Sequence, residues 1–245
     1  MRSLILADIH ANIEAFQAVL TDAEPHGPID QIWCLGDIVG YGPNPGEVID
    51  LLREHDHVSV AGNHDWAAIG KIDTRDFNPY ARAAAMWTRS QLSEEHVDYL
   101  VSLPTTLVKG DFTLAHGTPR DPIWEYLVTD TAALASLEHM ATNYCLVGHS
   151  HIPFVCRVDP TAMRCDFREF PVGMPVRLGE GTMFINPGGV GQPRDHNPAS
   201  NYAVYDSDYG VICHYRVPYD IPATQEKMRK ANLPEPLITR LSRGL

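Results

Sequence analysis

A series of polar clusters, each directly after a short apolar run, constrains this 245-residue sequence more than any other feature. The runs span residues 3–7, 32–35, 58–61, 112–115 and 145–147, and the clusters are Asp8-Ile9-His10, Gly36-Asp37, Gly62-Asn63-His64-Asp65, His116-Gly117 and Gly148-His149-Ser150-His151. A short continuous apolar run is typical of a buried strand. Because ligands bind outside the carboxyl ends of strands in open α/β sheets, we expect the five clusters to converge in space.

The segments between the first three runs are predicted to be helices. Ile13, Phe16, Val19 and Leu20 recur at helical intervals, and residues 45–54 begin with a proline in the first turn. Strands that alternate with helices predict a parallel sheet with helices packed on its faces.

Strands dominate the sequence from about residue 105 onward. Lys109-Gly110-Asp111 predicts a hairpin turn, and further short strands are expected up to residue 215, which suggests a mostly antiparallel second half. No internal repeat or low-complexity linker divides the chain. We therefore expect one domain over residues 1–245, in which two sheets pack face to face with helices outside. The proline-rich residues 218–245 are expected to form a C-terminal tail or partner-contacting arm.

The composition excludes several classes of protein. Lys and Arg total 19 against 31 Asp and Glu, a net charge of −12, which disfavours binding to extended nucleic acid. No apolar run is long enough for a membrane span, and Met1 precedes a strand with no signal-peptide pattern, so we expect a soluble, cytoplasmic protein with no membrane partner. The five cysteines form no CxxC pair, which favours reduced thiols in the core.

The clusters supply a set of side chains suited to metal binding, namely Asp8, His10, Asp37, Asn63, His116, His149 and His151. Taken singly, a histidine is usually a surface or core residue and a Gly-Asp pair is usually a turn. Five such clusters after five apolar runs favour a metal site instead. Oxygen and imidazole ligands suit Mn, Fe, Zn or Ni. Seven ligands exceed what one ion accepts, so we expect two ions about 3.5 to 4 Å apart that share a carboxylate.

The order and spacing of these clusters resemble the signature of the calcineurin-like metallophosphoesterases. The motifs are Asp8-x-His10, Gly36-Asp37-x-x-Gly40, Gly62-Asn63-His64-Asp65, His116 and Gly148-His149-x-His151. Residues 40–45, 116–120 and 186–194 are similar to those of small, stand-alone prokaryotic phosphoesterases. The resemblance implies a four-layer α/β/β/α sandwich with two central mixed sheets. It also implies that Asp8, His10 and His151 hold one metal, that Asn63, His116 and His149 hold the other, and that Asp37 bridges them.

The implied activity is that of a metal-dependent phosphoric ester hydrolase. Its substrates would be small phosphodiesters, phosphomonoesters or nucleoside polyphosphates, hydrolysed by direct attack of a metal-bridging hydroxide. His64, which is left outside the ligand set, would bind a phosphate oxygen or protonate the leaving alkoxide. Asp65 either orients His64 or caps the helix that follows.

Substrate contacts are expected outside the metal ligands. Gly188 and Gly189 lie in a glycine-rich segment that forms either an anion-receiving loop or an ordinary connection between strands. Arg120 and Arg194 are the expected phosphate contacts. Trp66, Trp124 and Tyr126 are candidate stacking surfaces, and burial in the core is the alternative for them.

Two other functions are compatible with the same motifs. A serine/threonine protein phosphatase would use the same metals and differ only in its substrate groove. A catalytically silent partner-binding scaffold of the same fold is the third hypothesis, and the complete ligand set with His64 argues against it. The sequence determines neither the physiological substrate nor the metal, and a homo-oligomer is compatible with it.

Overall fold

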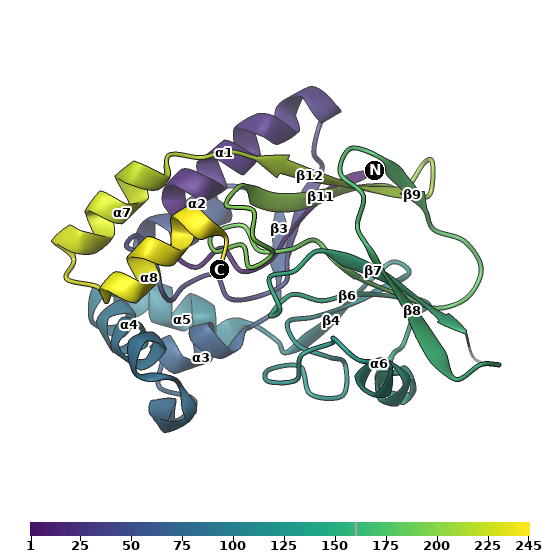
Figure 1. Cartoon of the computed structure of the whole chain (residues 1–245), viewed down its shortest axis with the longest axis horizontal. Coiled ribbons are helices and arrows are strands. Elements are labelled where there is room, and N and C mark those ends of the chain that lie inside the picture. The colour runs from purple at the N-terminus through teal and green to yellow at the C-terminus, as the bar shows by residue number, and fades with distance from the viewer. Residues whose placement is uncertain (160) are drawn as a thin grey trace.

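Two six-stranded mixed sheets form the centre of the protein in a computed structural model that describes residues 1–159 and 161–245. The first sheet has the strand order β3-β2-β1-β11-β12-β9, and the second has the order β4-β5-β6-β10-β7-β8. Figure 1 shows the strands side by side with helices above and below them and at the left of the view.

The strands are short, as expected for a layered domain. Those of the first sheet are β1 (Arg2–Leu6), β2 (Gln31–Cys34), β3 (His57–Ser59), β9 (Pro175–Arg177), β11 (Ser200–Asp206) and β12 (Val211–Val217). Those of the second sheet are β4 (Thr106–Lys109), β5 (Phe112–Ala115), β6 (Tyr144–Leu146), β7 (Phe154–Asp159), β8 (Arg164–Glu169) and β10 (Met183–Asn186).

The helices begin at residues that suit helix starts. Asn12 and Ser93 accept hydrogen bonds from backbone N–H groups of the helices that follow them, and proline occupies the first turn of α2, α4, α7 and α8. The α-helices are α1 (Ile13–Ala23), α2 (Pro45–Arg53), α3 (Asn63–Ala68), α4 (Pro79–Gln91), α5 (Glu94–Ser102), α6 (Asp130–Ser136), α7 (Ile221–Lys230) and α8 (Glu235–Thr239). The 3₁₀ helices are η1 (Glu24–His26), η2 (Thr74–Asp76), η3 (Leu137–His139) and η4 (Arg240–Arg243).

Burial on both faces of the sheet explains why residues 4–7, at the end of strand β1 and directly after it, are all apolar. Leu4 and Leu6 belong to the core cluster that includes α1 and α2, whereas Ile5 and Ala7 belong to the cluster between the two sheets. Successive side chains of a strand point to opposite faces, so a strand covered on both faces needs apolar residues at every position. The parallel pairs β1–β2 and β2–β3 bring the carboxyl ends of three strands to one edge.

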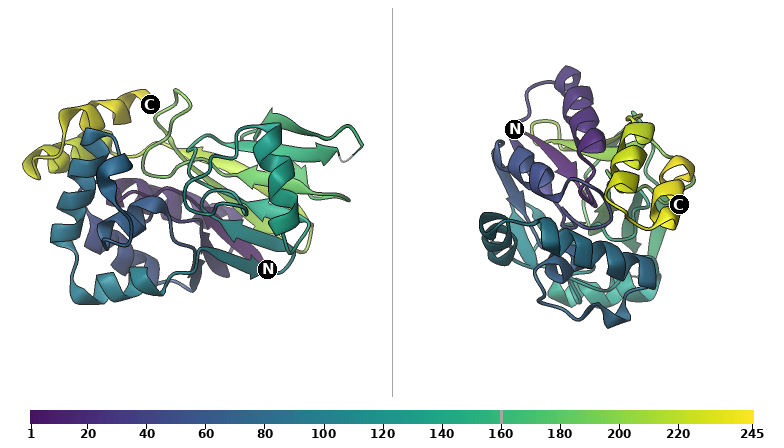
Figure 2. Two further views of the ribbon diagram at one scale, coloured as in Figure 1. Left: turned by 90° about the horizontal axis from the view of Figure 1, so that it is seen from below. Right: turned by 90° about the vertical axis from the view of Figure 1, so that its left-hand side faces the viewer.

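The layers confirm the expected α/β/β/α sandwich. One apolar cluster fills the space between the sheets, a second packs α1 and α2 against the first sheet, and a third packs α6 against the second sheet. Figure 2 shows the helices on the outside of both sheets, with α3, α4 and α5 gathered at one end.

Strand pairing in the second half of the chain is mostly antiparallel, as expected, through the pairs β4–β5, β7–β8, β7–β10, β9–β12 and β11–β12. The exceptions are the parallel pairs β5–β6 and β6–β10. Strands β11 and β12 belong to the first sheet, where β11 pairs with β1 and β12 pairs with β11. Strand β9 was not predicted. It is an edge strand of only three residues with two exposed positions, too short for a period in the sequence to indicate it.

The C-terminal segment packs against the body of the protein, whereas we expected a tail or arm over residues 218–245. Met228, Leu237 and Leu241 are buried in a cluster that also includes Tyr41 and Ala84. Helix α7 contacts α1, and the hydroxyl of Thr224 donates a hydrogen bond to Glu14 at 3.0 Å. The segment therefore forms part of the wall beside the polar clusters.

Two of the five cysteines are paired, so the expectation of reduced thiols is wrong for them. Cys156 in β7 and Cys165 in β8 form a disulfide with their Cα atoms 5.7 Å apart, and both remain buried as core residues. The antiparallel β7–β8 pairing brings them together, and sequence spacing alone does not show it. Across the described chain, every helix is too short or too polar to cross a membrane.

Candidate metal centre

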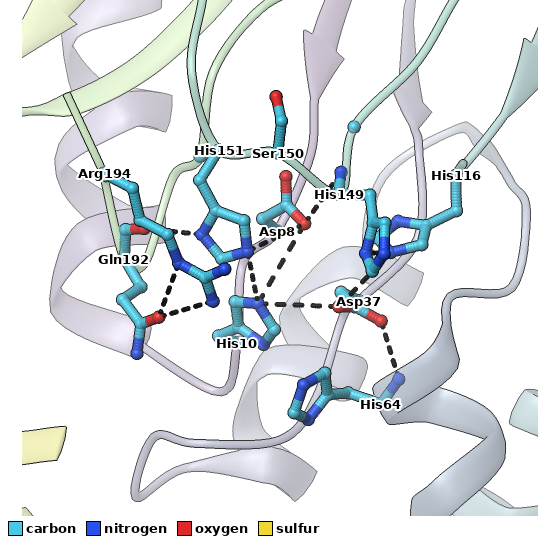
Figure 3. A network of polar contacts seen from close by, with 12 residues as sticks. Asp8, His10, Asp37, His64, His116, His149, Ser150, His151, Gln192 and Arg194 are labelled. Atoms are coloured by element: carbon cyan, nitrogen blue, oxygen red, sulfur yellow. Dashed lines mark hydrogen bonds and ion pairs between the residues drawn. The ribbon is translucent and has the colours of Figure 1, made fainter. Parts of the chain in front are cut away.

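All seven predicted ligands converge at one end of the two sheets (Figure 3). Asp8 and His10 follow β1, Asp37 follows β2, and Asn63 is the first residue of α3. The second sheet contributes the rest, because His116 follows β5, and His149 and His151 follow β6. Both sheets therefore supply the centre, as the strand-end positions of the clusters predict.

The backbone at these positions is strained. Five of the seven predicted ligands have positive φ angles, from 49° to 63°, namely Asp8, His10, Asp37, His149 and His151. Non-glycine residues rarely adopt this region, and each such residue costs on the order of 1 to 3 kcal/mol. Strain of this kind persists where function requires a side-chain direction, so the concentration here marks a functional site.

Each predicted histidine ligand has one ring nitrogen next to a backbone carbonyl. The Nδ1 atoms of His10, His116 and His151 lie 3.2, 2.9 and 2.6 Å from the carbonyl oxygens of Val39, Leu35 and Gln192. The Nε2 atom of His149 lies 3.2 Å from the carbonyl oxygen of Trp124. Only an N–H can be satisfied there, so the carbonyls fix the tautomers and leave the other nitrogens as lone-pair donors.

The free ring nitrogens face one another in two clusters. In the first cluster, His10 Nε2 lies 3.2 Å from His151 Nε2, and His151 Nε2 lies 3.4 Å from Asp8 Oδ1. In the second, His116 Nε2 lies 3.0 Å from His149 Nδ1 and 3.2 Å from Asn63 Oδ1. The two groups Asp8/His10/His151 and Asp37/His116/His149 each have the geometry of a candidate metal site.

Asp37 lies between the two clusters. Its Oδ2 atom is 3.6 Å from His10 Nε2 and 3.3 Å from His116 Nε2. Its Oδ1 atom accepts a hydrogen bond from the backbone N–H of His64 at 2.8 Å, which fixes the carboxylate plane. One oxygen of Asp37 is thus placed to serve both clusters.

Burial controls the protonation of the centre. It lowers the pKa of His149 to about 3 and the pKa values of His10 and His151 well below the ordinary range. Burial is also the largest single influence on His116 and lowers its pKa, but the charge of Asp37, the hydrogen bond to Asp37 and the charge of Asp8 together outweigh burial and raise that pKa to about 9. Three of the four imidazoles are therefore neutral near pH 7, which is the form that binds metals.

The residues fit a pair of metal ions. The Oδ2 atoms of Asp8 and Asp37 are buried and have no hydrogen-bond partner. The facing Nε2 atoms of His10 and His151 cannot form a hydrogen bond, because both are lone-pair donors. A buried polar group without a partner costs about 1 to 3 kcal/mol, and a pair of cations, one in each cluster, would satisfy these atoms.

His64 lies beside the centre and outside both ligand groups. Its ring is buried against Tyr41 and Phe77, at centroid distances of 4.2 and 4.9 Å, and its Nδ1 atom has no partner. Burial lowers its pKa to about 4. Asp65 does not contact this ring, since its carboxylate accepts from the N–H groups of Gly62 and Val39. Asp65 is therefore a helix cap, one of the two roles that the sequence left open.

Of the two arginines predicted to contact the phosphate, Arg194 lies at the site and Arg120 does not. Arg194 lines a cavity next to Asp37, His64 and His149, and Gln192 Oε1 accepts from its Nη2 at 2.9 Å. Arg120 is not among the residues lining this cavity, and its guanidinium forms an ion pair with Glu125 instead.

Backbone groups of the two predicted glycines form hydrogen bonds within the protein. The N–H of Gly188 donates to Asn186 Oδ1 at 2.8 Å, and the carbonyl of Gly189 accepts from Asn201. Gly188 has a φ of +81° and leaves no room for a side chain against Asn201. These observations favour a structural connection at Gly188 over an anion-receiving loop.

Two further contributors were not predicted. The Gln192 carbonyl accepts from His151, and its side chain holds Arg194, so one residue links a ligand to the cavity. Phe77 faces the site from the segment after η2, a part of the chain with no polar cluster at a strand end. Gln192 lies in the segment 186–194 that the sequence had singled out, whereas no sequence signal marks Phe77.

Known proteins share this arrangement. Residues 1–210 match the family model described as the calcineurin-like phosphoesterase superfamily domain. The structure is similar to that of a metallophosphoesterase from Sphaerobacter thermophilus, with a TM-score of 0.91 and 46% identity over 100% of this chain and 99% of that one. An uncharacterized protein of Methanocaldococcus jannaschii is 39% identical over 98% of this chain and 97% of its own length. A symmetrical bis(5'-nucleosyl)-tetraphosphatase of Erwinia tasmaniensis is 32% identical over 84 residues, 31% of each protein.

Proposed function

This chain belongs to the calcineurin-like phosphoesterase superfamily and is a phosphoric ester hydrolase, and from that premise we propose that it uses two metal ions to hydrolyse small phosphoesters. The proposed substrates are phosphodiesters, phosphomonoesters or nucleoside polyphosphates. The observation that carries the proposal is the position of Asp37 Oδ2, within 3.6 Å of a nitrogen in each cluster. A carboxylate shared in this way is what two adjacent ions require.

The proposed ligand sets follow the two clusters. Asp8, His10 and His151 would hold one ion, Asn63, His116 and His149 the other, and Asp37 would bridge them. When bound, a pair of divalent ions lowers the pKa of a coordinated water and neutralises charge on the phosphoryl oxygens. The mixed oxygen and imidazole donors suit Mn, Fe, Zn or Ni, and no cysteine of a structural zinc site takes part.

The remaining chemistry falls to residues that face the cavity. Water adds to phosphorus, the P–O bond to the leaving alcohol breaks, and the alcohol departs with a proton. His64 is the proposed donor of that proton or of a hydrogen bond to the phosphoryl oxygen, because it faces the cavity and belongs to neither ligand group. Arg194 would bind a second phosphoryl oxygen through the guanidinium that Gln192 orients.

The test is a metal and substrate panel. The purified protein is stripped of metal, loaded with Mn, Ni, Zn or Fe in turn, and assayed with 4-nitrophenyl phosphate, bis(4-nitrophenyl) phosphate, diadenosine tetraphosphate and a phosphoserine peptide. We expect hydrolysis of at least one small ester that requires the added metal. Full activity of the stripped protein would contradict the proposal, and hydrolysis of the peptide alone would favour the protein phosphatase hypothesis.

A further inference from the structure

The cavity above the metal centre has walls of aromatic side chains, which bear on the substrate of the proposed function. It encloses about 190 Å³, less than the roughly 300 to 1,000 Å³ of sites that bury drug-sized ligands. Asp37, His64 and His149 are among the residues that line it. Its aromatic lining consists of Tyr41, Phe77, Trp124 and Tyr126.

Two of these aromatic residues meet across the cavity from different parts of the fold. Phe77 comes from the segment between η2 and α4, and Trp124 comes from the connection between β5 and α6. Their rings contact edge to face, with centroids 5.6 Å apart and planes at 88°. Trp124 remains 39% exposed, so a large part of the indole is open to a flat ligand.

The position of Trp124 is fixed relative to the metal ligands. Its carbonyl oxygen accepts the hydrogen bond from His149 Nε2 at 3.2 Å, and the next-but-one residue, Tyr126, stacks on the ring of His149 at 4.0 Å. Within the same loop, the hydroxyl of Thr118 donates to Glu125 at 2.6 Å. An aromatic surface that is already rigid loses little conformational entropy when a ligand stacks on it.

The charges of the cavity suit a single phosphate. Among the described residues that line it, Arg194 is the only arginine or lysine, and Asp76 adds a negative charge at the same cavity. Arg120 forms an ion pair with Glu125 and does not line the cavity. Within the cavity lining, a chain of several phosphates would therefore find one arginine beyond the metal ions and would meet the carboxylate of Asp76, whereas Arg240 lies near Arg194 but outside the lining.

We propose that this enzyme acts on esters of a single phosphate with a flat aromatic group, a nucleoside or an aryl alcohol, whose ring stacks on Trp124 beside Phe77. This inference rests on the proposed function and narrows its substrate class. It assigns Trp124 as a specificity-determining residue. It also places dinucleoside polyphosphates outside the preferred substrates.

The test compares ligands that differ only in the aromatic ring. Binding of adenosine 5'-monophosphate and of ribose 5-phosphate to the metal-loaded protein is measured by calorimetry, in the wild type, in Trp124→Leu, and in Tyr209→Leu as a control. Tyr209 is 70% exposed in the turn between β11 and β12 and does not line the cavity. Because stacking of one base on an aromatic side chain is worth roughly 1 to 3 kcal/mol, we expect the wild type and the control to bind the nucleotide at least about fivefold more tightly than ribose 5-phosphate. In Trp124→Leu this preference should fall below about twofold.

Several outcomes would overturn the inference. Equal affinity for the two ligands in the wild type would exclude stacking, and a preference that survives in Trp124→Leu would exclude this residue. Binding of diadenosine tetraphosphate more than tenfold tighter than the monophosphate would contradict the single-phosphate part. Any of these three outcomes in a protein that still hydrolyses bis(4-nitrophenyl) phosphate rejects only this inference. Failure to hydrolyse any ester of the panel rejects the proposed function itself.

Discussion

Gly62, the residue before Asn63, is the position where one added methyl group is expected to damage the metal centre most. A Cβ atom there would lie 2.7 Å from Asp37 Cγ and closer still to Oδ1. The backbone of Gly62 has φ −104° and ψ 175°, which alanine adopts without strain. The effect of Gly62→Ala is therefore steric and acts on the proposed bridging carboxylate.

The required movement can be compared with the tolerance of metal coordination. Ordinary van der Waals contact begins near 3.4 Å and the added Cβ would lie 2.0 Å from Asp37 Oδ1, so Gly62 and the Asp37 carboxyl group must separate by about 1.4 Å. Ligand distances at metal sites are held within about 0.2 Å, so a displacement of this size exceeds the tolerance about sevenfold. Overpacking costs roughly 1 to 3 kcal/mol, which a domain with about 5 to 15 kcal/mol of stability survives.

The assay is elemental analysis of protein purified without chelators. We expect about two ions per chain in the wild type and fewer than about half an ion in Gly62→Ala, with turnover lost in proportion. Gly179→Ala is the matched control, because the nearest atom to its added Cβ is 4.0 Å away. A folded Gly62→Ala protein with two ions and normal turnover would refute the assignment of Asp37 as the shared ligand.

Three further predictions concern other residues. His64→Ala is expected to retain its metal while turnover falls roughly 10² to 10⁴-fold, more on alkyl than on nitrophenyl esters; loss of metal would place His64 among the ligands. Asp37→Asn should deplete both ions together, and elemental analysis that finds one ion retained would disprove a bridge. Burial lowers the pKa of His214 from 6.5 to about 4, so as the pH falls below 6.5 the unfolded chain takes up this proton before the folded one does, and folding stability drops. Urea unfolding of the metal-stripped protein should lose about 3 kcal/mol more between pH 6.5 and 4 than that of His214→Asn, and equal losses would show that His214 is not involved.

The sequence determined the parts of the structure that local patterns encode. The apolar run of β1 and the polar residues Asp8 and His10 after it belong to one short segment, and burial on both faces dictates such a run. The same reasoning located β2, β3, β5 and β6, and with β1 these strands precede the seven side chains that the structure brings together. The ligand roles themselves stay a prediction until metal content is measured.

Tertiary structure decided what depends on partners far away in the sequence. Whether Arg120 faces the site or pairs with Glu125, whether Cys156 meets Cys165, and whether Phe77 reaches Trp124 are contacts for which no periodicity exists. The order of the strands is likewise not encoded locally. The sequence of β11 is that of an ordinary apolar strand, and nothing in it shows that β11 pairs with β1 in the first sheet and not with a strand of the second sheet. The period of apolar residues along an element shows which of its faces is buried. Which neighbouring element covers that face depends on how the whole chain packs.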